Sequence, residues 1–425
     1  MRLPRMRRSS VSTRRSARAN ASRRMSSTAA TSSAARSRTT GSTGGCERRT
    51  RGARAMSANG ESLPSRVWKV ALVGARRGSS YGNLTHADPR FEIAALCDVN
   101  RDSLAAYQRA IGLPDARCFT DYGLLLGAGG FDAVIVCTPI PFHADQSVEA
   151  MDAGFHVMSE VTAANTVDGC ARIVAAARRT GKTYMLAENT CHRPLFAEWR
   201  RLLESGRLGE PIYAEADYLH PIPQLLVNEE TGQQTWRAQR PAIHYCSHSL
   251  GPVLMLTGDR IVRAMGIGAG TRILPEGGVG GIDVQVGVFE TAHGAIIKMT
   301  RTQVAPRHRP IHYYHIQGTK GFVETDRLGP EPGRPIQRGL LYIKAEMDHT
   351  RQVEWPEVDP TYPEYATMGG HGTSDYHTLL RFLNALDRGT KADLDETRAW
   401  DMTMPGLIAA ESAQNGGAWM DVPEA

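Results

Sequence analysis

Several features that mark other classes of protein are missing from this chain of 425 residues. No run of 18 apolar residues occurs, so the sequence offers no helix able to span a membrane. It has no CxxC pair, no Cys/His spacing typical of a zinc site and no internal repeat. Four histidines lie in predicted strands or loops, where we expect no metal site: His293, His308, His312 and His315. The sequence thus argues against a membrane protein, a repeat array and a metalloprotein.

The seven cysteines are scattered, at positions 46, 97, 118, 137, 170, 191 and 246. Two of them, Cys97 in IAALCDV and Cys137 in AVIVCTP, lie in apolar segments where a thiol usually acts as a small buried hydrophobe. Free buried thiols fit a reducing compartment, and no apolar stretch of export-signal length comes after the paired arginines near the amino terminus. We therefore expect a cytoplasmic protein, with import into an organelle open if the first segment is a transit peptide.

Acidic and aromatic residues are almost absent from the amino-terminal segment. Residues 1–55 hold fifteen arginines and one acidic residue, and no aromatic residue precedes Trp68. This segment carries a net charge of +14, and because the whole chain carries +6, the remaining 370 residues carry −8. A segment built from Arg, Ser, Ala and Thr cannot form a hydrophobic core, so we expect residues 1–62 to be a disordered leader.

Three interpretations of this leader compete: a transit peptide, a basic arm for nucleic acid, or residues upstream of the true start. We favour the third, because Met56 begins a natural-looking start, MSANGESLPSRVWKVALVG. The acidic charge of the remaining chain gives no reason to expect a nucleic-acid partner. A nucleic-acid-binding function therefore depends on the leader alone.

Short apolar runs alternate with longer helical patterns between Val67 and Glu188. The apolar runs are VWKVALV, FEIAALCD, DAVIVCTP, HVMSE and TYMLAE, and the helical segments are RDSLAAYQRAIG, HADQSVEAMDAG and NTVDGCARIVAAARRTG. Apolar strands buried on both faces, joined by helices that end in glycine, are typical of a parallel sheet. We predict an α/β fold with a Rossmann-type, doubly wound sheet in residues 63–190.

Strand-like segments succeed one another after Pro211 with few long helices between them. They are IYAEADYL, IVRAMGIG, DVQVGVFET, GAIIKMTRT, IHYYHIQG and GFVETD. This succession predicts an α+β second domain, residues 191–425, with a mostly antiparallel sheet. Two helices close the chain, DYHTLLRFLNALDRG and DETRAWDMTMPGLIAAESAQNGG, and we expect Pro405 to interrupt the second. We also expect both helices to pack back on the protein.

The turn after the first predicted strand is a candidate phosphate-binding turn. Gly74 comes directly after the strand, where a dinucleotide must approach the backbone and the next helix. The full G-x-G-x-x-G fingerprint is absent, because positions 74, 76 and 79 read Gly, Arg and Ser, and an ordinary strand-to-helix turn stays an alternative. We expect four residues of the turn to contact the cofactor: Gly74, Arg76, Arg77 and Gly78.

Asp98 ends the second predicted strand, 24 residues beyond Gly74. This is near the usual spacing of about 20 residues for a carboxylate that binds the adenosine ribose hydroxyls. A carboxylate repels a 2′-phosphate, so NAD is the expected cofactor, although Arg76, Arg77 and Arg101 leave NADP open. The alternative role for Asp98 is a helix N-cap.

Three further segments allow a family to be named: TPIPFH (138–143), SEVTAANT (159–166) and AENTCHR (187–193). Together with Asp98, and in this order, they resemble the Gfo/Idh/MocA family of oxidoreductases. The resemblance implies that the second domain is an open-faced sheet that covers the dinucleotide cleft and forms a homo-oligomer. It also implies five cofactor-binding residues: Thr138, Pro139, His143, Glu160 and Asn189.

One departure from that family concerns proton transfer. The family has Glu-Lys-Pro where this chain has Glu160, Val161 and Thr162, so the usual lysine is missing. Oxidation of a secondary alcohol still requires a group that removes the hydroxyl proton. Tyr245 and His248 are three residues apart in a predicted first helical turn, which places both side chains on one face. We expect them to be the catalytic acid/base pair, against the alternative of a buried structural pair.

The segment Tyr-x-x-His-x-Leu-Gly-Pro at 245–252 also resembles the branch of this family that contains NAD-dependent glycoside hydrolases, such as α-N-acetylgalactosaminidase. That branch likewise lacks the lysine. The resemblance implies oxidation of a ring carbon, elimination of the glycosidic oxygen, addition of water and re-reduction. The branch has Pro where Thr162 lies and Tyr where His192 lies, which leaves the substrate open. We expect five residues to contact a sugar: His192, His220, Trp236, Arg237 and His371.

The sequence predicts an NAD(P)-dependent oxidoreductase whose partner is a small carbohydrate or similar polyol. A redox-neutral glycosidase and a non-catalytic sugar or dinucleotide sensor stay as alternatives. The missing lysine favours the glycosidase and also fits a sensor, whereas Tyr245 and His248 argue against a sensor, which needs no acid/base pair.

Overall fold

A computed structural model of the chain describes residues 66–228, 230–308, 310–329 and 336–425. The predicted leader, residues 1–62, lies outside this range. All described residues belong to one compact unit. Within them, no helix combines the length and apolar character needed to cross a membrane.

The amino-terminal part is a parallel sheet of six strands in the order β3-β2-β1-β4-β5-β6. The strands are β1 (Trp68–Val73), β2 (Phe91–Cys97), β3 (Cys118–Phe119), β4 (Ala133–Val136), β5 (His156–Ser159) and β6 (Tyr184–Leu186). Five helices connect them: α1 (Ala75–Gly82), α2 (Arg101–Ile111), α3 (Tyr122–Ala128), α4 (His143–Asp152) and α5 (Val167–Thr180). This confirms the predicted Rossmann-type sheet.

The strand order reverses beside β1, which lies between β2 and β4. Chain crossings on either side of this point open a crevice at the carboxyl ends of the strands, where ligands bind in folds of this type. Gly74 lies at the centre of the crevice with a φ of 91°. A Cβ atom at this position would lie 2.6 Å from the carbonyl oxygen of Cys137, the residue directly after β4. The approach of these two loops therefore requires glycine.

The second sheet has nine strands in the order β14-β13-β12-β11-β7-β10-β9-β8-β15. They are β7 (Pro211–Leu219), β8 (Ile261–Gly268), β9 (Gln285–Thr291), β10 (Ile296–Thr302), β11 (His312–Gly318), β12 (Gly321–Thr325), β13 (Ile336–Ile343), β14 (Arg351–Pro356) and β15 (Met420–Asp421). Neighbouring strands are antiparallel except β7 and β10, which are parallel. The predicted mostly antiparallel sheet is confirmed.

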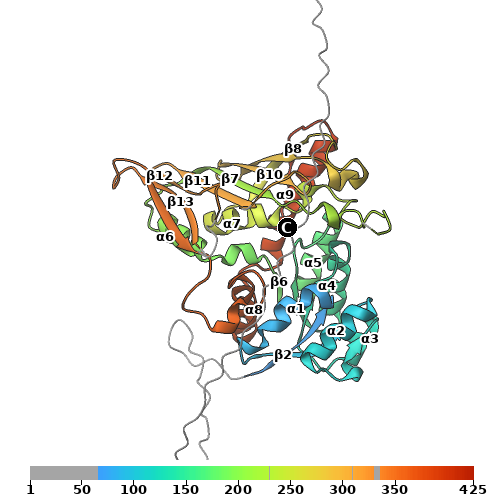
Figure 1. Cartoon of the computed structure of the whole chain (residues 1–425). Helices are drawn as coiled ribbons and strands as arrows, with labels where there is room; N and C mark the ends of the chain where they lie inside the picture. Colours follow the sequence, from blue (N-terminus) through green and yellow to red (C-terminus); the bar gives the residue numbers. More distant parts are fainter. Residues whose placement is uncertain (1–65, 229, 309, 330–335) are drawn as a thin grey trace, which may run out of the picture. The chain divides into compact units, whose positions relative to one another are not determined.

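Helices cover one face of this second sheet, and Figure 1 shows α6 (Pro194–Glu204) and α7 (Ser247–Thr257) beneath it. The parallel sheet lies on the far side of these helices. Helix α8 (Ser374–Arg388) packs near α1, so part of the carboxyl-terminal chain returns to the first sheet as expected.

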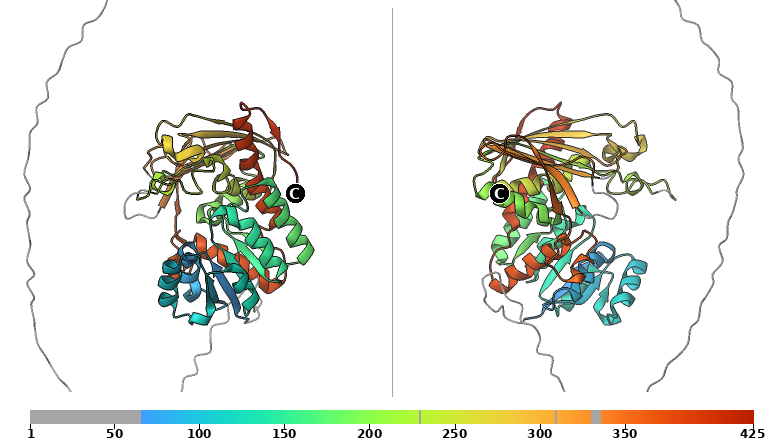
Figure 2. Two further views of the ribbon diagram at one scale, coloured as in Figure 1. Left: turned by 90° about the vertical axis from the view of Figure 1, so that its right-hand side faces the viewer. Right: turned by 60° about the vertical axis from the view of Figure 1, so that its left-hand side comes forward.

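Helix α9 (Glu396–Gln414) connects the two sheets, because it packs on α5, on β6 and on β8 (Figure 2). Contrary to prediction, Pro405 does not interrupt it. Most of the helix is buried, and this packing outweighs the cost of about 3 kcal/mol for an internal proline. Gly406 lets the helix touch the chain at 243–246, since a Cβ there would lie 2.8 Å from the carbonyl oxygen of Ile243.

Replacing Gly74 by alanine is expected to lower the free energy of unfolding more than the same change at Gly112. Both residues have a positive φ, of 91° and 68°, and this conformation costs a side-chain-bearing residue roughly 1–2 kcal/mol. Gly112 has open space around it, whereas Gly74→Ala also forces a clash with Cys137, which costs roughly 1–3 kcal/mol more. Urea denaturation of both variants measures the difference, and equal losses would contradict the predicted contact.

Candidate active site

A cleft of about 750 Å³ lies between the carboxyl ends of the parallel strands and the second sheet. Fourteen residues predicted from sequence line it: Gly74, Arg76, Arg77, Asp98, Thr138, Pro139, His143, Glu160, Asn189, His220, Trp236, Arg237, Tyr245 and His248. His371, a further predicted residue, lines it as well. The structure thus gathers residues that are as many as 297 positions apart in the chain, as Gly74 and His371 are.

Two predicted residues do not line this cleft. Gly78 is buried in α1, where a Cβ would contact Leu72 and Cys137 at ordinary distances, so it packs the helix on the sheet. His192 ends the short turn Asn189–His192 and is not among the residues that line the cleft, and its Nε2 is buried. Burial lowers the pKa of His192 to about 4, so the ring is neutral at physiological pH. The structure therefore does not bring His192 to the cleft with the other predicted residues.

The half of the cleft formed by the parallel strands fits a dinucleotide. Gly74 leaves its floor without a side chain, and Asp98 lies at its edge, directly after β2. The Asp98 carboxylate accepts hydrogen bonds from the backbone N–H groups of Ala75 and Asn100, both at 2.8 Å. Asp98 therefore caps the start of α1, and each oxygen keeps a further lone pair for a ribose hydroxyl. The capping role and the predicted ligand role are compatible.

His143 joins two loops of the same half. Its ring nitrogens lie 2.8 Å from the carbonyl oxygen of Thr162 and 2.7 Å from that of Thr138. The side chain is buried, and burial lowers its pKa. We infer that His143 holds the loops after β4 and β5 together at the cleft wall.

A buried carboxylate, Asp375 at the start of α8, organises the middle of the cleft. It accepts a hydrogen bond from Asn189 Nδ2 at 2.8 Å, and His371 Nδ1 lies 2.9 Å away. Arg77 lies between Asp375, at 3.4 Å, and Glu160, at 2.7 Å. Burial alone would raise the pKa of Asp375, but the hydrogen bond from His371 and the charge of Arg77 outweigh it and lower the pKa. Asp375 was not among the predicted residues, although His371, four positions earlier, was.

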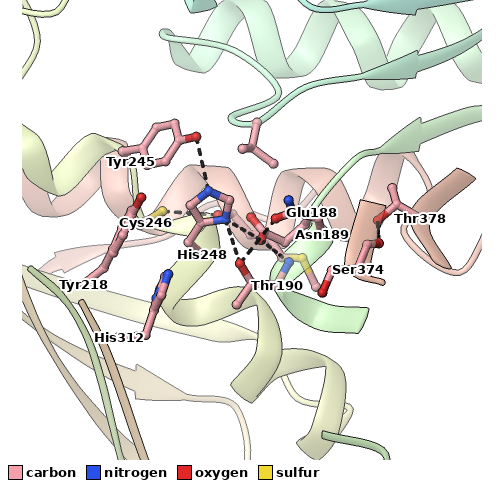
Figure 3. A network of polar contacts seen from close by, with 12 residues as sticks. Glu188, Asn189, Thr190, Tyr218, Tyr245, Cys246, His248, His312, Ser374 and Thr378 are labelled. Carbon is pink, nitrogen blue, oxygen red and sulfur yellow. Dashed lines mark hydrogen bonds and ion pairs between the residues drawn. The ribbon is translucent and has the colours of Figure 1, made fainter. Parts of the chain in front are cut away.

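Tyr245 and His248 come together on the opposite wall, although Tyr245 lies before α7 and not in its first turn, contrary to the prediction. Tyr245 comes directly after the turn Ala242–His244, and His248 is in the first turn of α7. The Tyr245 hydroxyl lies 3.3 Å from His248 Nε2 (Figure 3). On its other side, His248 Nδ1 lies 2.5 Å from Glu188 Oε1 and 3.0 Å from Thr190 Oγ1. Since Glu188 accepts the Nδ1 proton, the Nε2 lone pair faces Tyr245 and the cleft.

Glu188 is a functional candidate that the sequence patterns did not reveal. It lies just beyond β6 and its side chain is fully buried. Burial by itself raises the pKa of this carboxyl, but the charge of His248 and hydrogen bonds from His248 and Thr190 lower it below its usual value. An ionised carboxylate in this position orients the imidazole and stabilises its charged form.

Aromatic rings from the second sheet pack against Tyr245 and His248. Tyr218 stacks on His312 with ring centroids 4.3 Å apart, and Tyr314 donates a hydrogen bond to the backbone carbonyl of His248 (Figure 3 shows Tyr218 and His312). Burial raises the pKa of the Tyr245 phenol well above its usual value, so this hydroxyl stays protonated. The wall therefore presents a hydrogen-bond donor, Tyr245, next to a proton acceptor, His248.

Comparison with known proteins gives family matches over both parts of the chain. Residues 68–188 match the oxidoreductase family with an NAD-binding Rossmann fold, and residues 196–324 match the GFO/IDH/MocA C-terminal domain. A glycosyl hydrolase family 109 protein of Saccharopolyspora erythraea is 27% identical over 390 residues, covering 84% of this chain and 83% of the relative. The alpha-N-acetylgalactosaminidase of Tannerella forsythia is 25% identical over 393 residues, covering 78% and 80%.

Solved structures share the fold. An oxidoreductase domain protein from Kribbella flavida has a TM-score of 0.70 at 21% identity, covering 84% of this chain and all of that one. A levoglucosan dehydrogenase in complex with NADH and L-sorbose has a TM-score of 0.71 at 18% identity, covering 85% of this chain and all of that one.

Glu188→Gln is expected to change how the stability of the protein depends on pH. Because the pKa of Glu188 is lowered from its usual 4.5, its ionisation stabilises the fold above about pH 4.5, and this contribution is lost as the pH falls through the folded pKa. The variant should lose roughly 1.5–3 kcal/mol at neutral pH and show a shallower further loss on acidification. Denaturation from about pH 6 to about pH 3 measures both.

Glu204→Gln, at an exposed position of α6, is the matched control and should behave as the unmodified protein does. An unchanged pH dependence in Glu188→Gln would contradict the charged interaction between Glu188 and His248.

Proposed function

Because the chain belongs to the Gfo/Idh/MocA family of oxidoreductases, we propose that it is an NAD-dependent enzyme that oxidises a hydroxyl group of a sugar or similar polyol. The observation that carries this proposal is the Tyr245–His248–Glu188 arrangement on the wall of a cleft that fits a dinucleotide. A binding protein without catalysis has no use for an oriented imidazole next to a phenol. The sensor alternative is therefore the weaker one.

The residues of the chain supply the proton chemistry. Bound NAD would supply the hydride acceptor for the carbon that carries the hydroxyl group. His248 Nε2 is the base for the hydroxyl proton, and Tyr245 holds that hydroxyl by a hydrogen bond. Glu188 stabilises the charged imidazole that results, since its carboxylate lies 2.5 Å from Nδ1. Val161 replaces the family's lysine, and no lysine lines the cleft in the described part of the chain.

Several residues are placed to hold the cofactor. Asp98 fits the adenosine ribose, and its carboxylate disfavours a 2′-phosphate, which supports NAD over NADP. Gly74 and the start of α1 suit the pyrophosphate, and Asn189, fixed by Asp375, suits the nicotinamide end. Arg77 binds Glu160 and Asp375, so its role there is to order the cleft, and Arg76 is the more accessible cation.

A second candidate reaction is redox-neutral cleavage of a glycoside, supported by the relatives named as family 109 glycosyl hydrolases. Oxidation of a ring carbon would make the neighbouring C–H bond acidic, and the glycosidic oxygen would then leave by elimination as the proton is removed. Addition of water and return of the hydride to the ring carbon would complete a hydrolysis with no net redox change. His248 or Tyr245 is placed to handle the protons of such a sequence. Both candidates share the oxidation step and differ in the fate of the oxidised sugar.

We further propose that the protein is cytoplasmic and forms a homo-oligomer through the sheet face that α6 and α7 leave open (Figure 1). Light scattering after size-exclusion chromatography tests the second point, and a monomer at micromolar concentration would refute it.

Turnover assays separate the two reactions. The purified full chain is incubated with NAD and a panel of free sugars, inositols and aryl glycosides, while NADH absorbance and aglycone release are monitored in deuterated water. Steady accumulation of NADH identifies a dehydrogenase. Aglycone release without net NADH, with deuterium in the sugar ring, identifies the elimination route. Neither signal with any substrate would contradict both and favour a sensor.

His248→Ala is expected to lower kcat by roughly 10²–10⁴-fold, because loss of a general base has this effect. The dissociation constant of NAD should change little, since His248 bonds to Glu188 and Tyr245 and not to the loops around Gly74. His349→Ala, at an exposed histidine, is the control and should keep full activity. Full activity in His248→Ala would exclude His248 as the base.

A further inference from the structure

Three arginines gather around Tyr245 in the half of the cleft formed by the second sheet. We call Arg237, Arg240 and Arg301 the arginine cluster, and all three line the cleft. The guanidinium carbons of Arg240 and Arg301 lie 5.2 and 5.6 Å from the centre of the Tyr245 ring. Arg237 lies over Trp236 at 4.2 Å, and Arg240 lies 5.4 Å from the same ring. The positive charges are thus grouped beside the proposed base.

Among the described residues, Arg240 has no acidic partner to match its charge. Its exposed fraction is 6%, and its Nε and Nη1 atoms are buried without a hydrogen bond to those residues. Arg90 has the same exposed fraction of 6%, but it is paired with Asp88 and Asp387, both at 2.6 Å. Burying a cation without such a partner costs free energy, so such a cation is rarely found unless a ligand supplies the opposite charge. Burial and then repulsion from Arg301 and Arg237 lower the pKa of Arg240 to about 9.

Arg301 adds a charge that is fixed in place. Its exposed fraction is 2%, its Nη1 donates to the carbonyl oxygen of Tyr218 at 2.6 Å, and its Nε donates to that of Ala242 at 3.2 Å. Neutral carbonyls hold the guanidinium but do not cancel its charge. The positive potential of Arg301 therefore adds to that of Arg240 at the same place.

The carboxylates of the cleft already interact with other groups. Glu160 binds Arg77 at 2.7 Å, Glu188 binds His248, and Asp98 caps α1 on the dinucleotide side. In the part of the chain that the structure describes, none of them pairs with a member of the arginine cluster. The substrate half of the cleft thus has an excess of positive charge.

We propose that the arginine cluster binds an anionic group of the substrate, which makes the substrate an acidic sugar: a uronate, a sugar phosphate or a sugar sulfate. Guanidinium groups form paired, charge-assisted hydrogen bonds with the oxygens of such groups. Arg240 lines the cleft, and two of its buried nitrogens have no hydrogen bond to the described residues. The pyrophosphate of the cofactor is the other anion in reach, but its place is at Gly74 and the start of α1. This inference rests on the proposed function, because it names the substrate class for the same site.

Calorimetric titration of the full chain loaded with NADH tests the proposal without turnover, because the reduced cofactor cannot accept a hydride from the sugar. The ligands are matched pairs: D-glucuronate with D-glucose, D-galacturonate with D-galactose, and glucose 6-phosphate and glucose 6-sulfate with glucose. At least one anionic sugar should bind about tenfold or more tightly than its neutral partner, the gain expected of a hydrogen-bonded ion pair. The arm with the largest ratio identifies the anionic group. Equal affinity within every pair overturns the proposal.

Arg240→Gln should reduce that preference clearly, with Arg237 and Arg301 keeping part of it, and should leave the affinity for NAD unchanged. Arg109→Gln, at an exposed position of α2, removes the same charge far from the cleft and should keep the preference. If Arg240→Gln instead weakens NAD and spares the anionic sugar, the cluster serves the cofactor and the proposal is overturned.

A stability measurement separates ligand binding from a structural role. Arg240→Met should melt at the same temperature as the unmodified protein or higher in the absence of sugar, because it removes an unpaired buried charge. A clear fall in melting temperature would give Arg240 a structural role and overturn the proposal. The titration measures binding and does not depend on turnover. If the protein prefers anionic sugars but turns over no substrate, the proposed function is rejected and this inference is kept.

Discussion

The hydrogen bond between Glu188 and His248 is the interaction on which the site depends. It joins the end of the last parallel strand to the first turn of α7, so it connects the part of the chain that holds the dinucleotide with the part that covers it. Because Glu188 is fully buried, water does not screen its charge, and the charge interacts strongly with the Nδ1 side of the imidazole. The other nitrogen is thereby left as an acceptor toward Tyr245 and the cleft.

The fold was largely predictable because its signals are local. Apolar runs separated by helices that end in glycine predicted β1, β2, β4, β5 and β6, and strand-like segments predicted β7 to β12. β3 and β15 have two residues each, which is too short to give a sequence pattern. β13 and β14 were not predicted, because polar residues interrupt their apolar ones. The continuous path of α9 through Pro405 could not be read locally, because the burial that compensates for the proline comes from α5 and β8.

The site was predictable where a motif carried it and not where a distant contact did. Tyr245 and His248 are three residues apart, so they were expected to be close, although Tyr245 precedes α7 and does not share its first turn. Glu188 is 60 residues from His248, and Asp375 is 186 residues from Asn189, so each looked like an ordinary acidic residue until the fold paired it. His192 was placed in the site by its position in a motif, whereas the structure leaves it outside the lining of the cleft.

The contact between α9 and the segment before His248 has an evolutionary consequence. Gly406 allows the helix backbone to touch Ile243, and Cys246 donates a hydrogen bond to the carbonyl oxygen of Met402 at 3.2 Å. The position of the acid/base pair is thus specified partly by residues about 160 places further along the chain. Recombination between relatives that exchanged α9 alone would separate surfaces shaped for each other. The two segments are therefore expected to be inherited together, even as the loops between them diverge.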